Sequence, residues 1–321
     1  MNITSEWSLL EKIHRKVSGH YKNESLIEGI GDDCAVFSIN EATYGLLTTD
    51  IFIEYTHFKK AFSSPFQVGL KAMTANISDI ASMGGYAAYA VVSLAIPRDI
   101  EEEYVLQIYD GLLAAANGPG VDIVGGDISL SKQINLNITL YGTVDKNAII
   151  KRDGAQVGDT IYISGTLGKS KAGLEILYEE TEEYPSLVEK HLSPLSRYNI
   201  VDVIHNEYSP TAMIDVSDGL LSDLGHICRQ SNKGCKLNGD TFPIDRELQR
   251  YCSHKEKDFI DYFLTSGEEY ELLFTSSILK EPAVFSDIPI TPIGTIMDKG
   301  NILISDGREK PFEFVGFDHF K

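Results

Sequence analysis

Cysteine is scarce in this sequence, and the residues present are not spaced for a metal site or a redox pair. Cys34, Cys228, Cys235 and Cys252 form no Cys-x-x-Cys motif and no zinc-ligand pattern. Unpaired thiols of this kind favour a protein that works reduced, in the cytoplasm.

Basic residues and long apolar runs are also few. The apolar stretch at residues 86–97 falls well short of the ~20 residues that a membrane-spanning helix needs. The N-terminus has no basic start followed by an apolar core, so no secretory signal is expected. Lysine and arginine number 28 against 47 aspartates and glutamates, a net charge of −19. This balance argues against nucleic acid as a partner, but not against a phosphorylated ligand, because clustered carboxylates bind Mg²⁺ and Mg²⁺ binds phosphate.

The chain, at 321 residues, is longer than one ordinary core, so two domains are expected. A polar, turn-rich stretch at 145–160 places the boundary near residue 150, which gives domains 1–149 and 150–321. Strand and helix patterns alternate in both halves, and the expected class is α+β, although the sequence alone does not separate it firmly from α/β. Strands are predicted at 31–39, 44–58, 88–97, 121–127, 134–144 and 160–165, and helices at 5–17, 63–85, 101–120 and from Lys169.

Two glycine-rich stretches resemble phosphate-binding loops but do not satisfy either motif. GTLGKS at 165–170 follows a strand and opens a helix, yet only two residues separate Gly165 from the Gly-Lys pair, where a P-loop has four. A tight strand-to-helix turn is the better interpretation. GIGDDC lacks the third glycine of the dinucleotide fingerprint, because Cys34 stands in its place. The chain is therefore expected to handle phosphate in another way.

Acidic residues at the ends of apolar runs indicate how the chain could handle phosphate. Each stands beside small or hydroxyl residues, and hard cations prefer carboxylate, hydroxyl and carbonyl oxygens. Taken singly, such a residue is more often a turn or a helix cap. Together they predict a distributed cation site, in which Asp33 is the better ligand of the Asp32–Asp33 pair. The other members are Asp50 with Thr48 and Thr49, Asp127 with Gly125 and Gly126, and Asp215 and Asp218 with Ser217 between them.

Three further positions are ambiguous from the residues alone. Asp79 falls on a helix face with alanines and methionine, where an ionised carboxylate needs a partner, unless that face meets water. In TSGEEYELLF, alternation predicts Tyr270 buried with Glu269 and Glu271 on the other face, which is ordinary strand patterning. His57, at a strand end, is more often structural than ligand-binding. No order of residues indicates a nucleophilic side chain.

These motifs together carry a family resemblance. GIGDDCAVF, TTDIFIEYTHF, NISDIASMGG, VGGD, IDVSDGLLSDLGHIC and TSGEEYELLF stand in the order found in the thiamine-monophosphate kinases. That family belongs to the aminoimidazole-ribonucleotide-synthetase-like group of ATP-using enzymes, and the resemblance runs from about residue 5 to the closing GFDHF. It implies a homodimer whose N-terminal domains form a joint β-barrel, with an α/β C-terminal domain beside it. It also implies Mg²⁺-dependent transfer of phosphate from ATP to thiamine monophosphate.

The resemblance also implies roles for single residues, carried over by motif position. Direct in-line transfer fits the absence of a general base, since a phosphate oxygen is mostly ionised at neutral pH. Family members often have Trp where Phe314 stands. Metal ligands would be Asp33, Thr48, Thr49, Asp50, Asp79, Asp127, Asp215 and Asp218; ATP would meet Tyr109, Gly125, Gly126, Arg152 and Ser217; thiamine monophosphate would meet His57, Glu268 and Phe314.

Related enzymes and a non-catalytic protein are the alternatives. Selenophosphate synthetases carry a reactive cysteine or selenocysteine near the N-terminus, and no cysteine precedes Cys34 here. A hydrogenase-maturation protein of the group uses a C-terminal cysteine, whereas this chain ends in DHFK. Aminoimidazole ribonucleotide synthetase is disfavoured by the paired aspartates and by the context of His57. A silent nucleotide-binding regulator would have lost ligands, and none is missing from the motifs.

Overall fold

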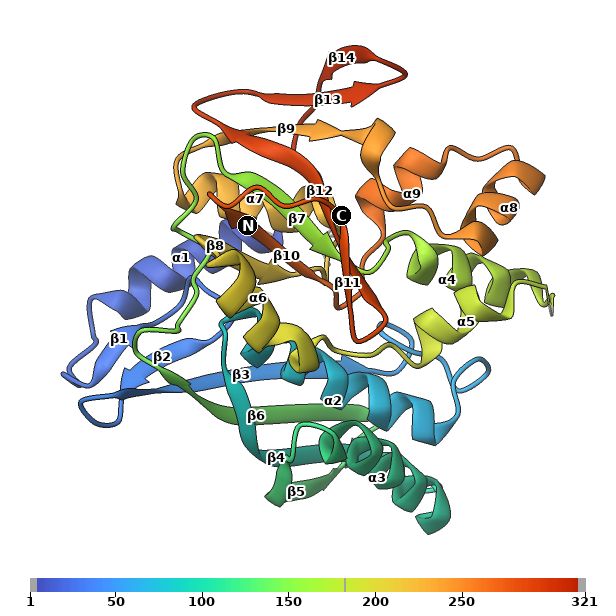
Figure 1. Cartoon of the computed structure of the whole chain (residues 1–321). Coiled ribbons are helices and arrows are strands. Elements are labelled where there is room, and N and C mark those ends of the chain that lie inside the picture. Colours follow the sequence, from blue (N-terminus) through green and yellow to red (C-terminus); the bar gives the residue numbers. More distant parts are fainter. Residues whose placement is uncertain (1–4, 182, 317–321) are drawn as a thin grey trace.

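The protein folds around two β-sheets, one from each half of the chain (Figure 1). The computed structural model describes residues 5–181 and 183–316, so the closing residues 317–321 of the family resemblance lie outside it. Among the described residues, no helix is both long and apolar enough to cross a membrane. The expected mixture of strands and helices in two sheet-containing halves is confirmed. The division at residue 150 and the barrel shared with a second copy stay predictions.

The first sheet follows the order β1-β2-β3-β6-β4-β5 in the described part of the chain. Its strands pair antiparallel, except β4 and β5, which run parallel. In β3, side chains alternate between a buried face and an exposed face, as expected for a sheet covered on one side. The strands are β1 (Leu26–Glu28), β2 (Ala35–Ser38), β3 (Thr43–Ile53), β4 (Tyr86–Ile96), β5 (Asp122–Leu130) and β6 (Asn135–Asp145).

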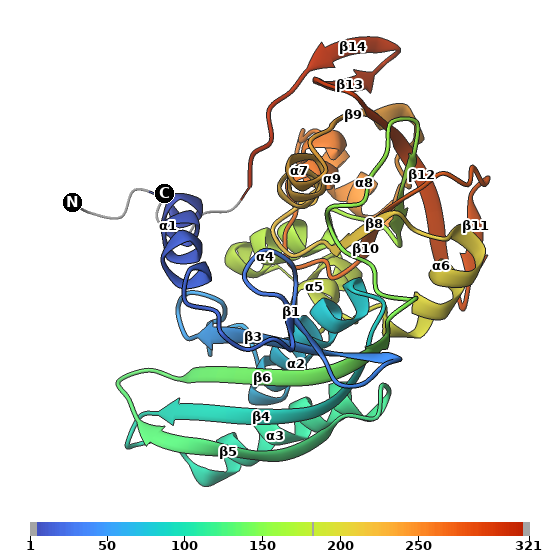
Figure 2. The same cartoon turned by 90° about the vertical axis from the view of Figure 1, so that its left-hand side faces the viewer.

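Helices α2 (Pro65–Ser82) and α3 (Glu102–Asn117) cover one face of this sheet (Figure 2). Helix α2 begins at a capping box, in which Ser64 and Gln67 satisfy each other's backbone amides. The two helices cross at glycines: a Cβ on Gly69 or on Gly111 would stand 1.9 Å from a carbonyl oxygen of the other helix. Glycine at both positions therefore lets the helices approach this closely.

The second sheet follows the order β14-β13-β9-β12-β7-β10-β8, with β11 paired to β12. Most neighbours are antiparallel, and β13 runs parallel to β9. The central strand β7 is buried on both faces, which fits its apolar run. The strands are β7 (Thr160–Ser164), β8 (Ala212–Asp215), β9 (Gly234–Asn238), β10 (Leu272–Ser276), β11 (Ala283–Phe285), β12 (Ile288–Met297), β13 (Asn301–Ser305) and β14 (Arg308–Pro311).

Both faces of the second sheet carry helices. Ile161 and Ile163 of β7 pack in one core with α7 and α9, while Tyr162 between them packs in another core with α6. The helices outside the first sheet are α1 (Glu6–Ser18), α4 (Lys169–Glu179), α5 (Pro185–Leu192), α6 (Val201–Tyr208), α7 (Leu220–Gln230), α8 (Arg246–His254) and α9 (Phe259–Thr265).

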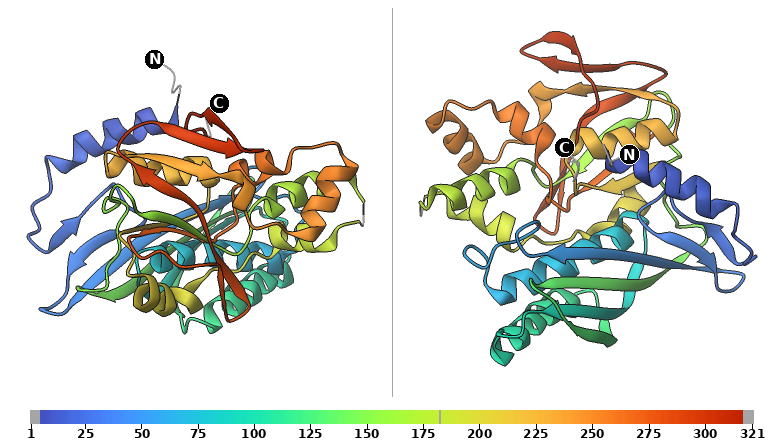
Figure 3. Two further views of the ribbon diagram at one scale, coloured as in Figure 1. Left: turned by 45° about the horizontal axis from the view of Figure 1, so that its top comes forward. Right: turned by 180° about the vertical axis from the view of Figure 1, so that it is seen from behind.

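Two sets of contacts join the halves close to the candidate active site. Helix α2 packs against β3 and β6 of the first sheet and against β8 of the second. In the right-hand view of Figure 3, the blue loop after β3, residues 54–64, lies near the green helix α4. Phe62 in this loop contacts Tyr178 of α4, with ring centroids 5.1 Å apart.

Most predicted elements match the structure, but the strand expected at 44–58 ends at Ile53, and one acidic stretch also differs. The helices expected at 63–85 and 101–120 are α2 and α3, and the strands at 134–144 and 160–165 are β6 and β7. The placing of Glu269 and Glu271 on the face opposite the buried Tyr270 was wrong, because all three side chains are buried. The strand β10 begins only at Leu272, so the alternation did not apply before it.

Candidate active site

A cavity of about 690 Å³ opens between the two halves. Its walls come from the end of β3 and the loop after it, from α2, from α4, and from the turns that follow β8 and precede β10. Seven predicted site residues line it: Asp50, His57, Asp79, Asp215, Ser217, Asp218 and Glu268. Residues from both halves of the chain thus share one cavity.

Three carboxylates form a compact cluster at this cavity. Asp33, Asp79 and Asp215 each offer an oxygen, and these oxygens lie within 4.8 Å of one another. They come from the turn before β2, from α2 and from the end of β8. Two carboxylates of the cluster therefore come from the first half of the chain and one from the second.

Hydroxyl groups orient all three carboxylates. Ser78 donates to Asp215 at 2.6 Å, Ser82 to Asp33 at 2.6 Å and Thr48 to Asp79 at 2.5 Å. Ser78 and Ser82 stand one helical turn apart on α2 and hold carboxylates from the two different halves. The cluster is held by hydrogen bonds before any ligand enters.

Burial and mutual repulsion raise the pKa of several of these acids. Burial, with the negative charge of Asp33 added, raises the pKa of Asp215 to about 8. Burial and the nearby charges of Asp33 and Asp218 raise the pKa of Asp50 to about 6. Burial and the charge of Asp50 raise the pKa of Asp79 well above its usual value. Crowded carboxylates of this kind are the groups that a divalent cation would stabilise in their ionised form.

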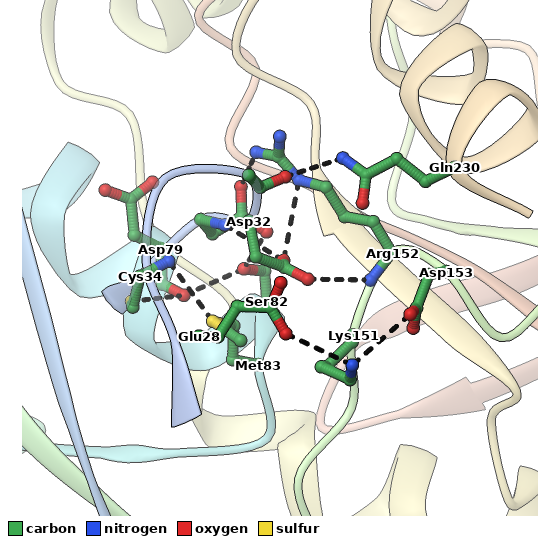
Figure 4. A network of polar contacts seen from close by, with 12 residues as sticks. Glu28, Asp32, Cys34, Asp79, Ser82, Met83, Lys151, Arg152, Asp153 and Gln230 are labelled. Carbon is green, nitrogen blue, oxygen red and sulfur yellow. Dashed lines mark hydrogen bonds and ion pairs between the residues drawn. The ribbon is translucent and has the colours of Figure 1, made fainter. Parts of the chain in front are cut away.

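Arg152 supplies the nearest cation of the chain itself (Figure 4). Its guanidinium donates to Asp33, and its Nε lies 3.6 Å from an oxygen of Asp32. Asp32 also accepts the backbone amides of Asp33 and Arg152, at 2.9 and 3.1 Å. Burial, together with the charge of Asp33, raises the pKa of Asp32 to about 6. The adjacent aspartates therefore differ: Asp32 fixes the backbone of Arg152, and Asp33 joins the cluster.

Two of the three residues assigned to the acceptor, His57 and Glu268, line the cavity. His57 lines the cavity, and its Nδ1 accepts the backbone amide of Ile53 at 3.0 Å. Glu268 also lines it, at a φ of +55°, and its carboxylate lies 2.7 Å from the ammonium of Lys71. A positive φ at a non-glycine residue is a strained conformation, and such residues cluster at functional sites.

Phe314 does not line the cavity in the described structure. Its ring packs against Gly225 of α7 and lies 6.0 Å from the guanidinium of Arg229. The following residues, Val315 and Gly316, line the cavity in its place.

Further assigned residues lie elsewhere in the first half of the chain, on the first sheet and, for Tyr109, on α3. Thr49 points to the exposed face and donates to the carbonyl of Ile138. Asp127 lies on the edge strand β5, opposite Ser93 of β4, roughly 14 Å across the sheet from β3 at ordinary strand spacing. Within the described chain, none of the following lines the cavity: Thr49, Tyr109, Gly125, Gly126 and Asp127.

The P-loop-like stretch has a structural partner of its own. The amides of Gly168 and Ser170, at the start of α4, donate to one oxygen of Glu269 at 2.8 and 2.9 Å. Gly168 has a φ of +101°, as the sharp turn from β7 requires. The helix start that a phosphate would occupy in a P-loop is bound by a carboxylate, which agrees with the predicted tight turn.

Several site residues were missed by the sequence reasoning. Asp223, buried in the first turn of α7, accepts the amide of Asp218, and burial and the charge of Asp218 raise its pKa well above the usual value. Its place five residues after Asp218 in SDGLLSD was the available clue. Lys71 and His191, both close to Glu268, come from segments far away in sequence, and no local pattern marks them.

Comparison with known proteins indicates the class of protein to which the chain is similar. Residues 31–144 match the family model described as AIR synthase related protein, N-terminal domain. Hydrogenase-maturation proteins called HypE share the architecture at 17% identity, with a TM-score of 0.69 in one complex, and show the fold alone. Residues 31–144 thus resemble the N-terminal domain of the AIR-synthase-related proteins.

Closer relatives define the family within this class. The chain belongs to the thiamine-monophosphate kinase family. It is 38% identical over 296 residues to the thiamine-monophosphate kinase of Aquifex aeolicus, covering 91% of this chain and 92% of that one. It is 32% identical to the Bacillus subtilis enzyme, covering 98% and 99%. A solved structure of AaThiL complexed with AMPPCP and TMP has a TM-score of 0.86 and 33% identity, covering 100% and 99%.

Proposed function

We propose that the chain transfers the terminal phosphoryl group of ATP to the phosphate of thiamine monophosphate, giving thiamine diphosphate and ADP. The observation that carries this proposal is the cluster of Asp33, Asp79 and Asp215, of which Asp79 and Asp215 line a cavity large enough for a substrate. Family membership and the relative solved with AMPPCP and TMP support the choice of substrates.

Magnesium fits the residues at this site. The donors are carboxylate and hydroxyl oxygens, which hard cations prefer. Burial, with the charges of neighbouring carboxylates added, raises the pKa of Asp79 and of Asp215, and a bound cation would favour their ionised forms. Asp33, Asp79 and Asp215 would hold the metal, with Asp50 and Asp218 nearby. Bound Mg²⁺ supplies positive charge that offsets the repulsion between ATP and the acceptor phosphate.

The chain's own groups position the reactants and require no base. An oxygen of the acceptor phosphate forms the new bond to the terminal phosphorus as the bond to ADP breaks, and that oxygen is already mostly ionised at neutral pH. Arg152, which contacts Asp33, presents a planar guanidinium that could bind two phosphate oxygens beside a metal held at Asp33. Glu268, held by Lys71, faces the cavity as an anionic contact for the cationic acceptor.

A homodimer accounts for the assigned residues outside the cavity. The face of the first sheet away from α2 exposes large apolar side chains, and an apolar patch of this kind marks an interface. Asp127, Gly125 and Thr49 lie on or beside the same face, so a second copy there would complete the nucleotide site. The exposed apolar residues of this face include Leu47, Ile51, Tyr89 and Val91.

The test is ADP release by the purified protein with ATP, Mg²⁺ and thiamine monophosphate. We expect release only when all three are present, thiamine diphosphate as the product, and little release with free thiamine. The same assay with the substrates of the related synthetases tests the alternatives. A protein that makes no thiamine diphosphate under these conditions does not have the proposed function.

A further inference from the structure

The cavity has an aromatic end as well as an acidic end. Phe62, in the loop after β3, and Tyr178, on α4, both line it and meet edge to face at 82°, with centroids 5.1 Å apart. Tyr178 is 56% exposed, so much of its ring is open to a ligand. Neither residue belongs to a motif of the family resemblance.

A cation already occupies this aromatic end. The ammonium of Lys59 lies 4.6 Å from the ring centroid of Tyr178 and 5.8 Å from that of Phe62. Both distances are within the range in which the negative face of a ring attracts a positive charge. The rings therefore form a place for positive charge, and the free chain fills it with its own side chain.

The loop that carries Lys59 and Phe62 is held firmly at its base. Glu54 pairs with Lys60 at 3.2 Å and accepts the amide of Ile134 at 3.0 Å. The amide of Phe62 donates to the carbonyl of Lys59 at 2.9 Å, which closes a turn between them. These bonds hold the backbone of the loop at Glu54 and between Lys59 and Phe62.

The acceptor matches the two ends of the cavity. Thiamine monophosphate carries a phosphate and a permanently charged thiazolium ring, and the phosphate belongs at the acidic end, where the metal would bind. Acidic side chains around the cavity outnumber its two lysines, Lys59 and Lys171, and this excess of negative charge favours a cationic ring. The acidic residues are Glu6, Asp50, Asp79, Asp215, Asp218 and Glu268.

We infer that Tyr178 and Phe62 form the wall against which the cationic ring of the acceptor lies, in the place that the ammonium of Lys59 takes in the free chain. This inference rests on the proposed function, because it takes thiamine monophosphate as the acceptor. It assigns Tyr178 a role in specificity, selecting a charged ring over a neutral one of the same shape. Tyr178 takes no part in the transfer of the phosphoryl group.

The test compares two ligands and four proteins by isothermal titration. The ligands are thiamine monophosphate and its neutral isostere, in which carbon replaces the thiazolium nitrogen. The proteins are the wild type, Tyr178→Leu, Tyr178→Phe and the control Phe66→Leu. Phe66 is 39% exposed and does not line the cavity, so its replacement changes an aromatic residue away from the proposed site.

We expect Tyr178→Leu to raise the Kd for thiamine monophosphate about 3- to 30-fold, the range that corresponds to a cation–ring contact. The Kd for the neutral isostere should change by less than about 2-fold in the same variant, since only the charge contact is lost. Tyr178→Phe keeps the ring and should bind both ligands like the wild type, as should Phe66→Leu.

The inference and the proposed function fail in different ways. The inference is wrong if Tyr178→Leu binds thiamine monophosphate as tightly as the wild type. It is also wrong if the variant binds both ligands more weakly by the same factor, because the ring of Tyr178 then does not distinguish the charged ligand from the neutral one. In that case the wild type still makes thiamine diphosphate. A wild type that binds no thiamine monophosphate and makes no thiamine diphosphate overturns both.

Discussion

Replacing Asp215 by asparagine is expected to stabilise the metal-free protein while it abolishes turnover. The carboxylate is 1% exposed and is crowded by Asp33, and its pKa is about 8, against 3.8 for the ordinary group. Below pH 4 the carboxyl is protonated in the unfolded chain as well, and the folded state bears no penalty. Between pH 4 and pH 8 the folded state holds a proton that the unfolded chain has lost, so stability falls as the pH rises.

The size of this penalty follows from the shift. Each pH unit in that window costs about 1.4 kcal/mol, so by pH 7 the penalty approaches roughly 4 kcal/mol. Asp33 and Asp50 share the repulsion, and replacing one acid recovers only part of the penalty. We expect Asp215→Asn to gain about 1–3 kcal/mol at pH 8 and almost nothing at pH 4. The amide oxygen of asparagine can still accept the hydrogen bond from Ser78.

The assay is urea unfolding in EDTA at several pH values, repeated with Mg²⁺. The gain of Asp215→Asn over the wild type should grow from pH 4 to pH 8. Mg²⁺ should stabilise the wild type and have little effect on the variant, because a ligand of the metal is missing. The exposed turn residue Asp99 gives the control Asp99→Asn, for which no difference is expected. A variant less stable than the wild type at pH 8 in EDTA would refute the reasoning.

Two further predictions test the interface and the helix crossing. Asp127→Asn should abolish turnover and leave the melting temperature close to that of the wild type. Asp50→Asn should also abolish turnover but raise the melting temperature in EDTA at neutral pH, because burial raises the pKa of Asp50 to about 6; wild-type rates in either variant remove that residue from the metal site. Gly111→Ala should destabilise by at least about 2 kcal/mol, because the new Cβ would stand 1.9 Å from the carbonyl oxygen of Phe66. The control Gly19→Ala, where nothing lies within 4 Å, should melt within a degree or two of the wild type; equal melting temperatures for both variants would contradict the close crossing.

Local patterns predicted the elements and part of the site. Ser64 and Gly84 mark the ends of α2 in the sequence, and the aspartates at the ends of apolar runs include the cluster itself. Contacts between distant segments could not be predicted in this way. Glu271 is buried because Lys190 and Arg197, 81 and 74 positions earlier, pair with it. A buried acid whose partner is distant in sequence has the same local sequence pattern as an acid exposed to water.

The three hydroxyls around the cluster have a consequence for how the two halves stay in register. Ser78 and Ser82 are separated by one turn of α2, a rise of about 6 Å, and each holds an acid from a different half of the chain. The repeat of the α-helix thus sets the spacing between Asp33 and Asp215, which come from segments far apart in the sequence. One residue inserted between the two serines would rotate one of them by about 100° and part Asp33 from Asp215, with both sheets intact. The distance between Asp33 and Asp215 therefore depends on the pitch of α2.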